Sequence, residues 1–221
     1  MPFFMMPRFS HLIFDLDGTL VDTQADLAAA TNYMLTALGL APLSLAQVAE
    51  LIGHGARVLV EKALGPARDH LVDRGFALFM EYYSAHTLDH TRLYAGLEGL
   101  LPAAQAQGLK LTILTNKPET PSRFIVSGLG LTDFFVEIVG GDTLPTKKPD
   151  PLGVLYLQRQ TGVALSETLL IGDSRVDYET GVAAGIAVCG VTWGFGAADL
   201  RSLSPQFLVH TPQELGAVVL S

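Results

Sequence analysis

Short apolar runs alternate along the chain with segments that have helical periodicity. Runs of this length without strict polar alternation are typical of strands in a parallel sheet that helices cover on both faces. We predict such strands at residues 12–14, 109–114, 135–139, 168–171 and 186–191. Helix-start chemistry lies between them, for example Thr120 as an N-cap before Pro121. The repeated strand–helix order predicts an α/β fold with a doubly wound, mostly parallel, Rossmann-like sheet.

The stretch from residue 23 to residue 94 differs, because it has helical periodicity and no convincing strand. Apolar stripes at helical spacing indicate helices that pack their apolar face into a core. The stripes comprise Leu27, Ala30, Met34, Leu35 and Leu38, and further along Phe76, Phe79, Met80 and Tyr83. Ser44 and Gln47 match a capping box, which predicts the start of another helix. We therefore predict a helical domain at residues 23–94, inserted into an α/β core formed by residues 1–22 and 95–221.

The composition indicates a folded, acidic protein. Of its 221 residues, 49% are hydrophobic and 16% are charged, which excludes an intrinsically disordered chain. Twenty-two acidic residues against 14 basic ones give a net charge of −8, which argues against nucleic acid as the main partner. Cys189 is the single cysteine, so no intrachain disulfide can form.

The N-terminal segment is apolar but does not have the pattern of a signal peptide. Pro2, Pro7 and Arg8 interrupt it, and no small-residue cleavage site follows. No stretch reaches the ~18 apolar residues of a membrane-spanning helix. We expect a soluble cytoplasmic protein with no membrane or nucleic-acid partner. A monomer and a homodimer both fit the sequence.

The sharpest chemical signal follows the first predicted strand directly. Asp15 and Asp17 are two residues apart, so in an extended chain their side chains project to the same side. They lie at the carboxyl end of a strand, where α/β folds bind ligands. Two carboxylates about 4 Å apart repel by about 4 kcal/mol at an effective dielectric near 20, so the pair needs a cation, a proton or basic partners. Gly18 permits a sharp turn and a close approach of the backbone to a ligand.

Three further motifs follow later strands. Thr115 and Asn116 offer a hydroxyl and backbone amides that can donate to phosphate oxygens. Lys148 stands before a proline-opened helix, from which its ammonium can reach an anionic group. Asp173 and Asp177 are four residues apart, so one helical turn brings them together. With the first carboxylate pair they form a set of oxygen ligands that suits Mg²⁺.

These motifs, in this order and each at the end of a different predicted strand, resemble those of the haloacid dehalogenase (HAD) superfamily over the whole chain. The helical insertion resembles that superfamily's C1 cap. Strings that resemble its bacterial phosphoglycolate phosphatase branch are FDLDGTLVDTQADLAAA, LIGHGARVLVEKAL, LTNKP, KKPDP and GDSRVDYETGVAAG. The resemblance implies a Mg²⁺-dependent phosphatase that hydrolyses a small phosphate monoester through an aspartyl-phosphate, with 2-phosphoglycolate as the favoured substrate.

The resemblance also implies roles for individual residues. Asp15 would be the nucleophile, and Asp17 would protonate the leaving alkoxide and then activate water. Thr115 and the Asn116 backbone amide would bind phosphate oxygens. Lys148 would neutralise charge between Asp15 and the phosphoryl group.

A metal site and a specificity loop are implied in the same way. Mg²⁺ would be held by Asp15, the backbone carbonyl of Asp17 and Asp173, with Asp177 orienting metal-bound water. The loop over residues 53–57 resembles the cap's specificity loop. Gly55 lets the backbone approach a small substrate, and His54 or Arg57 could pair with a carboxylate. A helix-linking turn with a solvated Arg57 is the competing interpretation.

Other functions stay open at this point. Phosphatases of the same superfamily that act on sugar phosphates or nucleotides are alternatives. The mutase branch tends to place a histidine where this chain has Leu27-Ala28, and a dehalogenase needs no acid at the position of Asp17. A phospho-accepting receiver module also combines acidic residues, Thr and Lys around Mg²⁺, but it lacks a helical insertion after the first strand. A catalytically idle binding module is disfavoured because the chemical residues are intact, namely Asp15, Asp17, Lys148 and Asp173.

Overall fold

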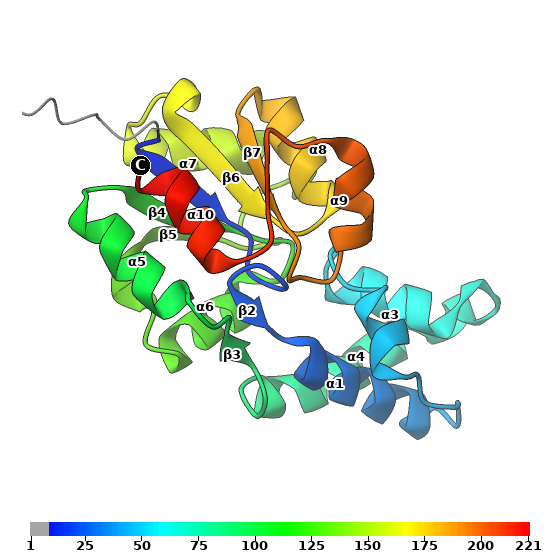
Figure 1. Cartoon of the computed structure of the whole chain (residues 1–221). Coiled ribbons are helices and arrows are strands. Elements are labelled where there is room, and N and C mark those ends of the chain that lie inside the picture. Colours follow the sequence, from blue (N-terminus) through cyan, green and yellow to red (C-terminus); the bar gives the residue numbers. More distant parts are fainter. Residues whose placement is uncertain (1–8) are drawn as a thin grey trace, which may run out of the picture.

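A computed structural model gives the structure of the protein and describes residues 9–221, with only the backbone described at Ala198. Residues 1–8, which include most of the segment considered above as a targeting signal and the start of the predicted core, lie outside the described residues. A six-stranded sheet lies between layers of helices, and a group of helices extends beyond one end of it (Figure 1). The strands are β1 (His11–Phe14), β4 (Lys110–Leu114), β5 (Phe135–Val139), β6 (Thr168–Gly172), β7 (Ala187–Val191) and β8 (Phe207–Val209).

The sheet has the order β5-β4-β1-β6-β7-β8, and every neighbouring pair is parallel. The predicted doubly wound parallel sheet is therefore confirmed, and each of the five predicted strands is present within one residue at either end. Strand β8 was not predicted from the pattern. The chain adds β4 and β5 on one side of β1 and β6 to β8 on the other. The strand order therefore changes direction at β1. A ligand site is expected where the order changes, outside the carboxyl ends of β1, β4 and β6.

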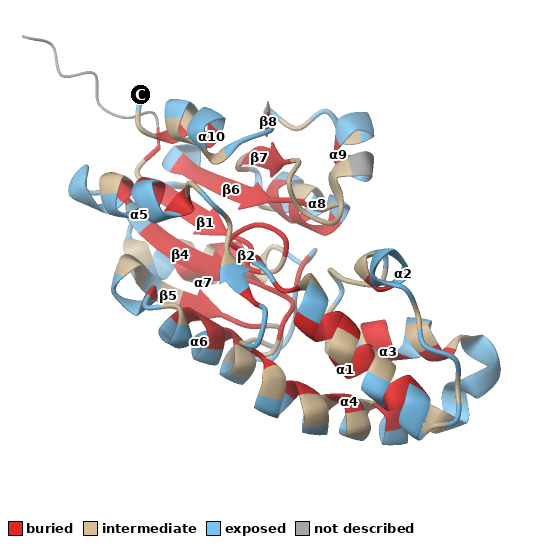
Figure 2. Cartoon of the chain, turned by 60° about the horizontal axis from the view of Figure 1, so that its bottom comes forward, coloured by how far each residue is buried: buried red, intermediate tan, exposed pale blue. Residues whose placement is uncertain are grey.

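Helices cover both faces of the sheet because successive residues of a strand point to opposite faces. In β1, Leu12 and Phe14 pack into one apolar cluster and Ile13 packs into another. The first cluster includes residues of α5 (Leu97–Ala106), α6 (Glu119–Gly128) and α10 (Pro212–Val219). The second includes residues of α7 (Leu152–Thr161) and α8 (Arg175–Ala184). Burial on both faces explains why the strands are continuous apolar runs (Figure 2).

The helical block, defined here as residues 24–86, consists of α1 (Gln24–Ala37), α2 (Leu45–Ala49), α3 (Ala56–Leu64), a 3-10 helix (Pro66–Leu71) and α4 (Val72–His86). It has an apolar cluster of its own, in which Met34, Val60 and Phe79 are fully buried. The predicted capping box at Ser44 and Gln47 is present and starts α2. The block thus packs as a separate unit beside the sheet (Figure 1).

Two sequence expectations about local structure are wrong. A two-stranded antiparallel ribbon joins β2 (Val21–Asp22) to β3 (Arg92–Leu93), so the stretch from 23 to 94 does contain a strand, although one too short to leave a pattern. Helix α6 begins at Glu119, two residues before the predicted start at Pro121. Its cap comes from Asp142, whose carboxylate accepts a hydrogen bond from the Glu119 amide at 2.7 Å. A short α9 (Ala197–Leu203) follows β7, and no helix among residues 9–221 is long and apolar enough to cross a membrane.

Candidate active site

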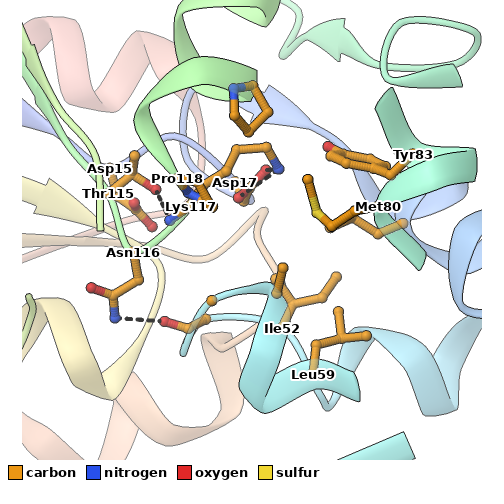
Figure 3. Close-up of a pocket in the computed structure, with 15 residues that line it drawn as sticks. Asp15, Asp17, Ile52, Leu59, Met80, Tyr83, Thr115, Asn116, Lys117 and Pro118 are labelled. Carbon is orange, nitrogen blue, oxygen red and sulfur yellow. Dashed lines mark hydrogen bonds and ion pairs between the residues drawn. The ribbon is translucent and has the colours of Figure 1, made fainter. Parts of the chain in front are cut away.

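A cavity lies between the carboxyl ends of the central strands and the helical block, as Figure 3 shows. It has an empty volume of about 500 Å³, part of it open to solvent. Asp15, Asp17 and Thr115 line it from the sheet, and Met80 and Tyr83 of α4 face them from the helical block. The site is therefore assembled from both parts of the molecule.

Lys148 joins two of the predicted carboxylates. Its ammonium lies 2.8 Å from Oδ1 of Asp15 and 2.5 Å from Oδ1 of Asp177. All three side chains are buried. Burial acts to lower the pKa of Lys148, but the two carboxylates outweigh that effect and raise the pKa, so Lys148 stays charged.

Asp173 is held by a loop that follows β7. Its Oδ2 accepts hydrogen bonds from the backbone amides of Phe195 at 2.6 Å and Gly196 at 3.2 Å. Gly18 approaches this carboxylate so closely that a Cβ there would lie 2.5 Å from Oδ2 of Asp173. The backbone of Gly18 also has a φ of +82°, so both its conformation and its surroundings require glycine.

The carboxylates outnumber the positive charge beside them. Oxygens of Asp15, Asp173 and Asp177 lie within 4.8 Å of one another, and among the described residues the cation that contacts two of these carboxylates is Lys148. Burial raises the pKa of Asp15 to about 8, opposed by Lys148 and reinforced by the carboxylates of Asp177 and Asp173. Burial and the Asp177 carboxylate likewise raise the pKa of Asp173 to about 7, against the loop amides. Such a site binds a further cation favourably.

The donor set fits Mg²⁺, because it consists of oxygens only. Both oxygens of Asp177 are already engaged, one with Lys148 and the other with the hydroxyl and backbone amide of Ser174. Asp15 contacts Lys148 through Oδ1, and Oδ1 of Asp173 accepts a longer hydrogen bond, at 3.4 Å, from the Thr19 hydroxyl. A neutral contact of that length is easier to replace than the ammonium contact of Asp177, so Asp15 and Asp173 are better placed than Asp177 to offer an oxygen to a metal ion. This difference agrees with an outer position for Asp177.

Asp17 has hydrogen-bond and ion-pair partners of its own. Its Oδ1 accepts a hydrogen bond from the Thr23 hydroxyl at 2.7 Å, and its two oxygens lie 2.9 and 3.2 Å from the Lys117 ammonium. The Lys117 ammonium in turn lies 4.8 Å from the centre of the Tyr83 ring. Asp15 and Asp17 thus share the cavity but have different cationic partners, as Figure 3 shows for Asp17 and Lys117.

Thr115 and Asn116 lie where β4 ends, and both are buried. The Asn116 side-chain amide donates to the carbonyls of Gly53 and Lys148, at 3.1 Å each, which fixes its orientation. A Cβ on Gly55 would lie 2.8 Å from the Asn116 carbonyl oxygen, so the predicted specificity loop packs directly on this motif. Thr115, Asn116 and Gly55 all line the cavity.

His54 and Arg57 do not line this cavity. The His54 carbonyl accepts a hydrogen bond from Lys147 at 2.8 Å, and His54 lines a neighbouring hollow together with Asp173. The Arg57 side chain is 53% exposed and lies 2.6 Å from Asp73. A substrate-binding role for these two residues remains a prediction, and the arrangement of Arg57 matches the solvated alternative.

Comparison with known proteins assigns the family. The profile of the haloacid dehalogenase-like hydrolase family matches residues 12–191, most of the chain. The chain belongs to this family. Members of the haloacid dehalogenase-like family generally use Mg²⁺, which agrees with the oxygen-rich cluster at the strand ends.

Relatives within the family are similar over nearly the full chain. A Pseudomonas putida protein named phosphoglycolate phosphatase is 40% identical over 211 residues, covering 92% of this chain and 76% of its own length. A Neisseria gonorrhoeae protein of the same name is 39% identical, covering 93% and 88%. A solved structure from Haemophilus somnus, described as a predicted phosphoglycolate phosphatase, superposes with a TM-score of 0.90 at 32% identity, covering 96% of this chain and 99% of that one.

The sequence did not single out two residues that the structure places in the site. Lys117 lies within the string LTNKP, whose resemblance implies roles for Thr115 and Asn116 alone. Tyr83 was interpreted as core packing because it falls on an apolar helical stripe. Its ring is buried in that way, yet it also lines the cavity. The apolar spacing of α4 predicts which face of the helix is buried. It does not predict which residues of the sheet lie opposite the Tyr83 hydroxyl.

Proposed function

We propose that this protein is a Mg²⁺-dependent phosphatase that hydrolyses a small phosphate monoester, with 2-phosphoglycolate as the favoured substrate. The observation that carries the proposal is the arrangement around Asp15. Its carboxylate lies beside the Lys148 ammonium and the Asp173 carboxylate, while a second acid, Asp17, faces the same cavity. This combination offers a nucleophile, positive charge for a phosphoryl group and an acid–base group.

In the first step of the proposed reaction, a carboxylate oxygen of Asp15 attacks phosphorus. The bond from phosphorus to the ester oxygen breaks, and Asp17 donates a proton to the leaving oxygen. Lys148 stays close to the attacking carboxylate and offsets negative charge on the transferring group. The products are a free alcohol and an aspartyl-phosphate on Asp15.

In the second step, water attacks the phosphorus of the aspartyl-phosphate. Asp17, now ionised, takes a proton from that water. The bond between phosphorus and the Asp15 oxygen breaks, which releases inorganic phosphate and regenerates the carboxylate. The hydrogen bond from Thr23 and the contact with Lys117 hold Asp17 facing the cavity for both transfers.

Asp15, Asp173 and the backbone carbonyl of Asp17 would hold the Mg²⁺ ion, with Asp177 outside the coordination shell. When bound, the ion supplies positive charge to the phosphoryl oxygens and to the surplus carboxylates. We also propose that Thr115 and the Asn116 backbone amide bind phosphate oxygens. Gly18 and Gly55 would let the backbone approach the substrate from the sheet and from the helical block.

The choice of substrate rests on similarity and size. The relatives described above carry the name phosphoglycolate phosphatase at about 40% identity. The helical block lines one side of the cavity, and we propose that this block acts as a cap over residues 23–94. The empty volume of about 500 Å³, part of it open to solvent, suits a small ester. Asp17 favours a phosphatase over a dehalogenase, because a dehalogenase does not need an acid there.

A phosphate-release screen tests the proposal. Purified protein would be offered 2-phosphoglycolate, sugar phosphates, nucleotides and an aryl phosphate, each with Mg²⁺ and with EDTA. We expect the highest kcat/KM with 2-phosphoglycolate and loss of turnover in EDTA. Turnover that survives EDTA, or long-lived phosphorylated protein without turnover of any ester, would contradict it. The second outcome would favour a receiver module.

A further inference from the structure

The cavity contains a positive charge that the proposed chemistry does not use on the phosphoryl group. Lys117 is only 6% exposed, and its ammonium lies on the side of Asp17 that faces the helical block. An ammonium has three N–H donors that point in different directions, and the Asp17 carboxylate lies on one side of this ammonium. Lys117 therefore has donors left for a further anion beside Asp17.

A hydroxyl donor lies next to that charge. Tyr83 is 2% exposed, and its buried hydroxyl has no hydrogen-bond acceptor among the described residues. Figure 3 shows this hydroxyl directed toward the Lys117 ammonium. Burial raises the pKa of Tyr83 to about 12, partly offset by Lys117, so the hydroxyl keeps its proton. A buried donor without an acceptor is costly, which points to a ligand atom at this place.

The remaining wall on the side of the helical block is apolar. Leu27, Ile52, Leu59 and Met80 line it, and none can bind a charged group. Two nearby cations have other partners, since Arg57 is directed to Asp73 and solvent and Lys147 donates to the His54 carbonyl. Among the described residues that line this part of the cavity, Lys117 and Tyr83 are thus the polar side chains available to the organic part of a substrate.

We propose that Lys117 and Tyr83 form a subsite that binds a carboxylate of the substrate immediately beside its ester oxygen. The proposal rests on the proposed phosphatase function and deepens it. Asp17 has to reach the ester oxygen, and Lys117 lies 2.9 Å from Asp17. A carboxylate separated from that oxygen by one carbon, as in phosphate esters of 2-hydroxy acids, falls within reach of both groups. Longer acids would place their carboxylate against the apolar wall.

The test compares 2-phosphoglycolate with its amide, which has the same shape but no charge. We expect the wild-type protein to prefer the acid by about tenfold to a hundredfold in kcat/KM, the effect of a charge-assisted hydrogen bond. Lys117→Met should bring this ratio close to one, and Tyr83→Phe should lower it by about threefold to tenfold. Tyr82→Phe is the matched control on the same helix, because Tyr82 stacks on Tyr33 and His86 instead, and it should leave the ratio unchanged.

The ratio of kcat/KM for the acid to kcat/KM for the amide distinguishes loss of carboxylate binding from a disturbance of Asp17, which would affect both substrates. If Lys117→Met and Tyr83→Phe slow both substrates equally, the two residues act through Asp17 or through folding, and the subsite is overturned. Should a thermal melt show that Lys117→Met is unfolded, Tyr83→Phe decides alone. If the wild-type protein hydrolyses neither ester, the phosphatase function fails first. Isothermal titration calorimetry on the protein that does not react then measures the ratio of the two dissociation constants. Equal affinity for the acid and the amide would contradict the proposed subsite.

Discussion

The Lys148 ammonium lies 2.8 Å from the Asp15 carboxylate, and both groups are buried. A buried ion pair contributes little net stability, because desolvation cancels much of the attraction. The pair is therefore better understood through function. It keeps a charged lysine against the atom that would attack phosphorus.

Lys148→Met should lower kcat by about a hundredfold to a thousandfold, since it removes a fixed charge beside the reacting group. Lys147→Met is the matched control, because Lys147 is exposed and donates to the His54 carbonyl instead. Steady-state kinetics of phosphate release would compare the two. Similar losses in both variants would show that the position of Lys148 beside Asp15 has no special effect.

Metal binding should be visible without turnover. Mg²⁺ is expected to raise the melting temperature, because it relieves repulsion among the buried carboxylates, and Asp173→Asn should remove most of that rise. Ca²⁺ should bind but inhibit, since its larger shell can take both Asp15 oxygens. Differential scanning fluorimetry and phosphate release in each ion measure these effects. Equal rates in Mg²⁺ and Ca²⁺, or a full Mg²⁺ shift in Asp173→Asn, would refute this assignment.

His11 should make the fold sensitive to acid. It is fully buried, its Nε2 lies 2.8 Å from the Thr112 hydroxyl, and burial lowers its pKa to about 4. Between that value and the ordinary pKa of about 6.5, the unfolded chain binds a proton that the folded chain does not. Stability therefore falls as the pH falls through this window, by about 2 kcal/mol between about pH 7.5 and pH 5.

Urea unfolding of the wild type and of His11→Gln at the two pH values isolates this contribution. Asp15 and Asp173 have raised pKa values and oppose it, because they gain protons in the fold as the pH falls. Their effect cancels when the two proteins are subtracted. His70→Gln, at an exposed position, is the control. A difference that does not change with pH would show that His11 has the same pKa in the folded and the unfolded protein, which would contradict this account.

Asp26, in α1 of the helical block, contacts the segment between α4 and β3. Its buried carboxylate accepts hydrogen bonds from the amides of His90 and Thr91 and from the Thr91 hydroxyl, at 2.8 to 3.0 Å. Asp26→Asn replaces a carboxylate oxygen with an NH₂ group, which cannot accept hydrogen bonds from these amides and this hydroxyl. The substitution should lower the free energy of unfolding by about 1.5–3 kcal/mol. Asp89→Asn, which breaks only an exposed pair with His86, should cost less than about 1 kcal/mol. Equal losses in urea unfolding would contradict this account of Asp26.

Prediction from the sequence was most accurate where residues close together in the chain determine the local structure. The apolar runs fix the strands because both faces of the sheet are buried, and Ser44 starts α2 through its own neighbours. The start of α6 could not be read in this way, because its cap comes from the distant Asp142. The same limit applies to the site. Motif residues were found because strand ends converge, whereas the contact of Tyr83 with Lys117 depends on how the helical block lies against the sheet.

The central claim is that the phosphoryl group is transferred to Asp15, and that Asp17 donates a proton to the leaving oxygen and then takes one from water. Intact-protein mass spectrometry after an acid quench tests it directly, with an aryl phosphate whose leaving group needs little protonation. Asp17→Asn keeps the nucleophile but has no base for water, so it should accumulate one phosphoryl group. Asp15→Asn should show no added mass, because an amide is a poor nucleophile. Phosphorylation of the Asp15→Asn variant, or wild-type turnover by Asp17→Asn, would contradict the account.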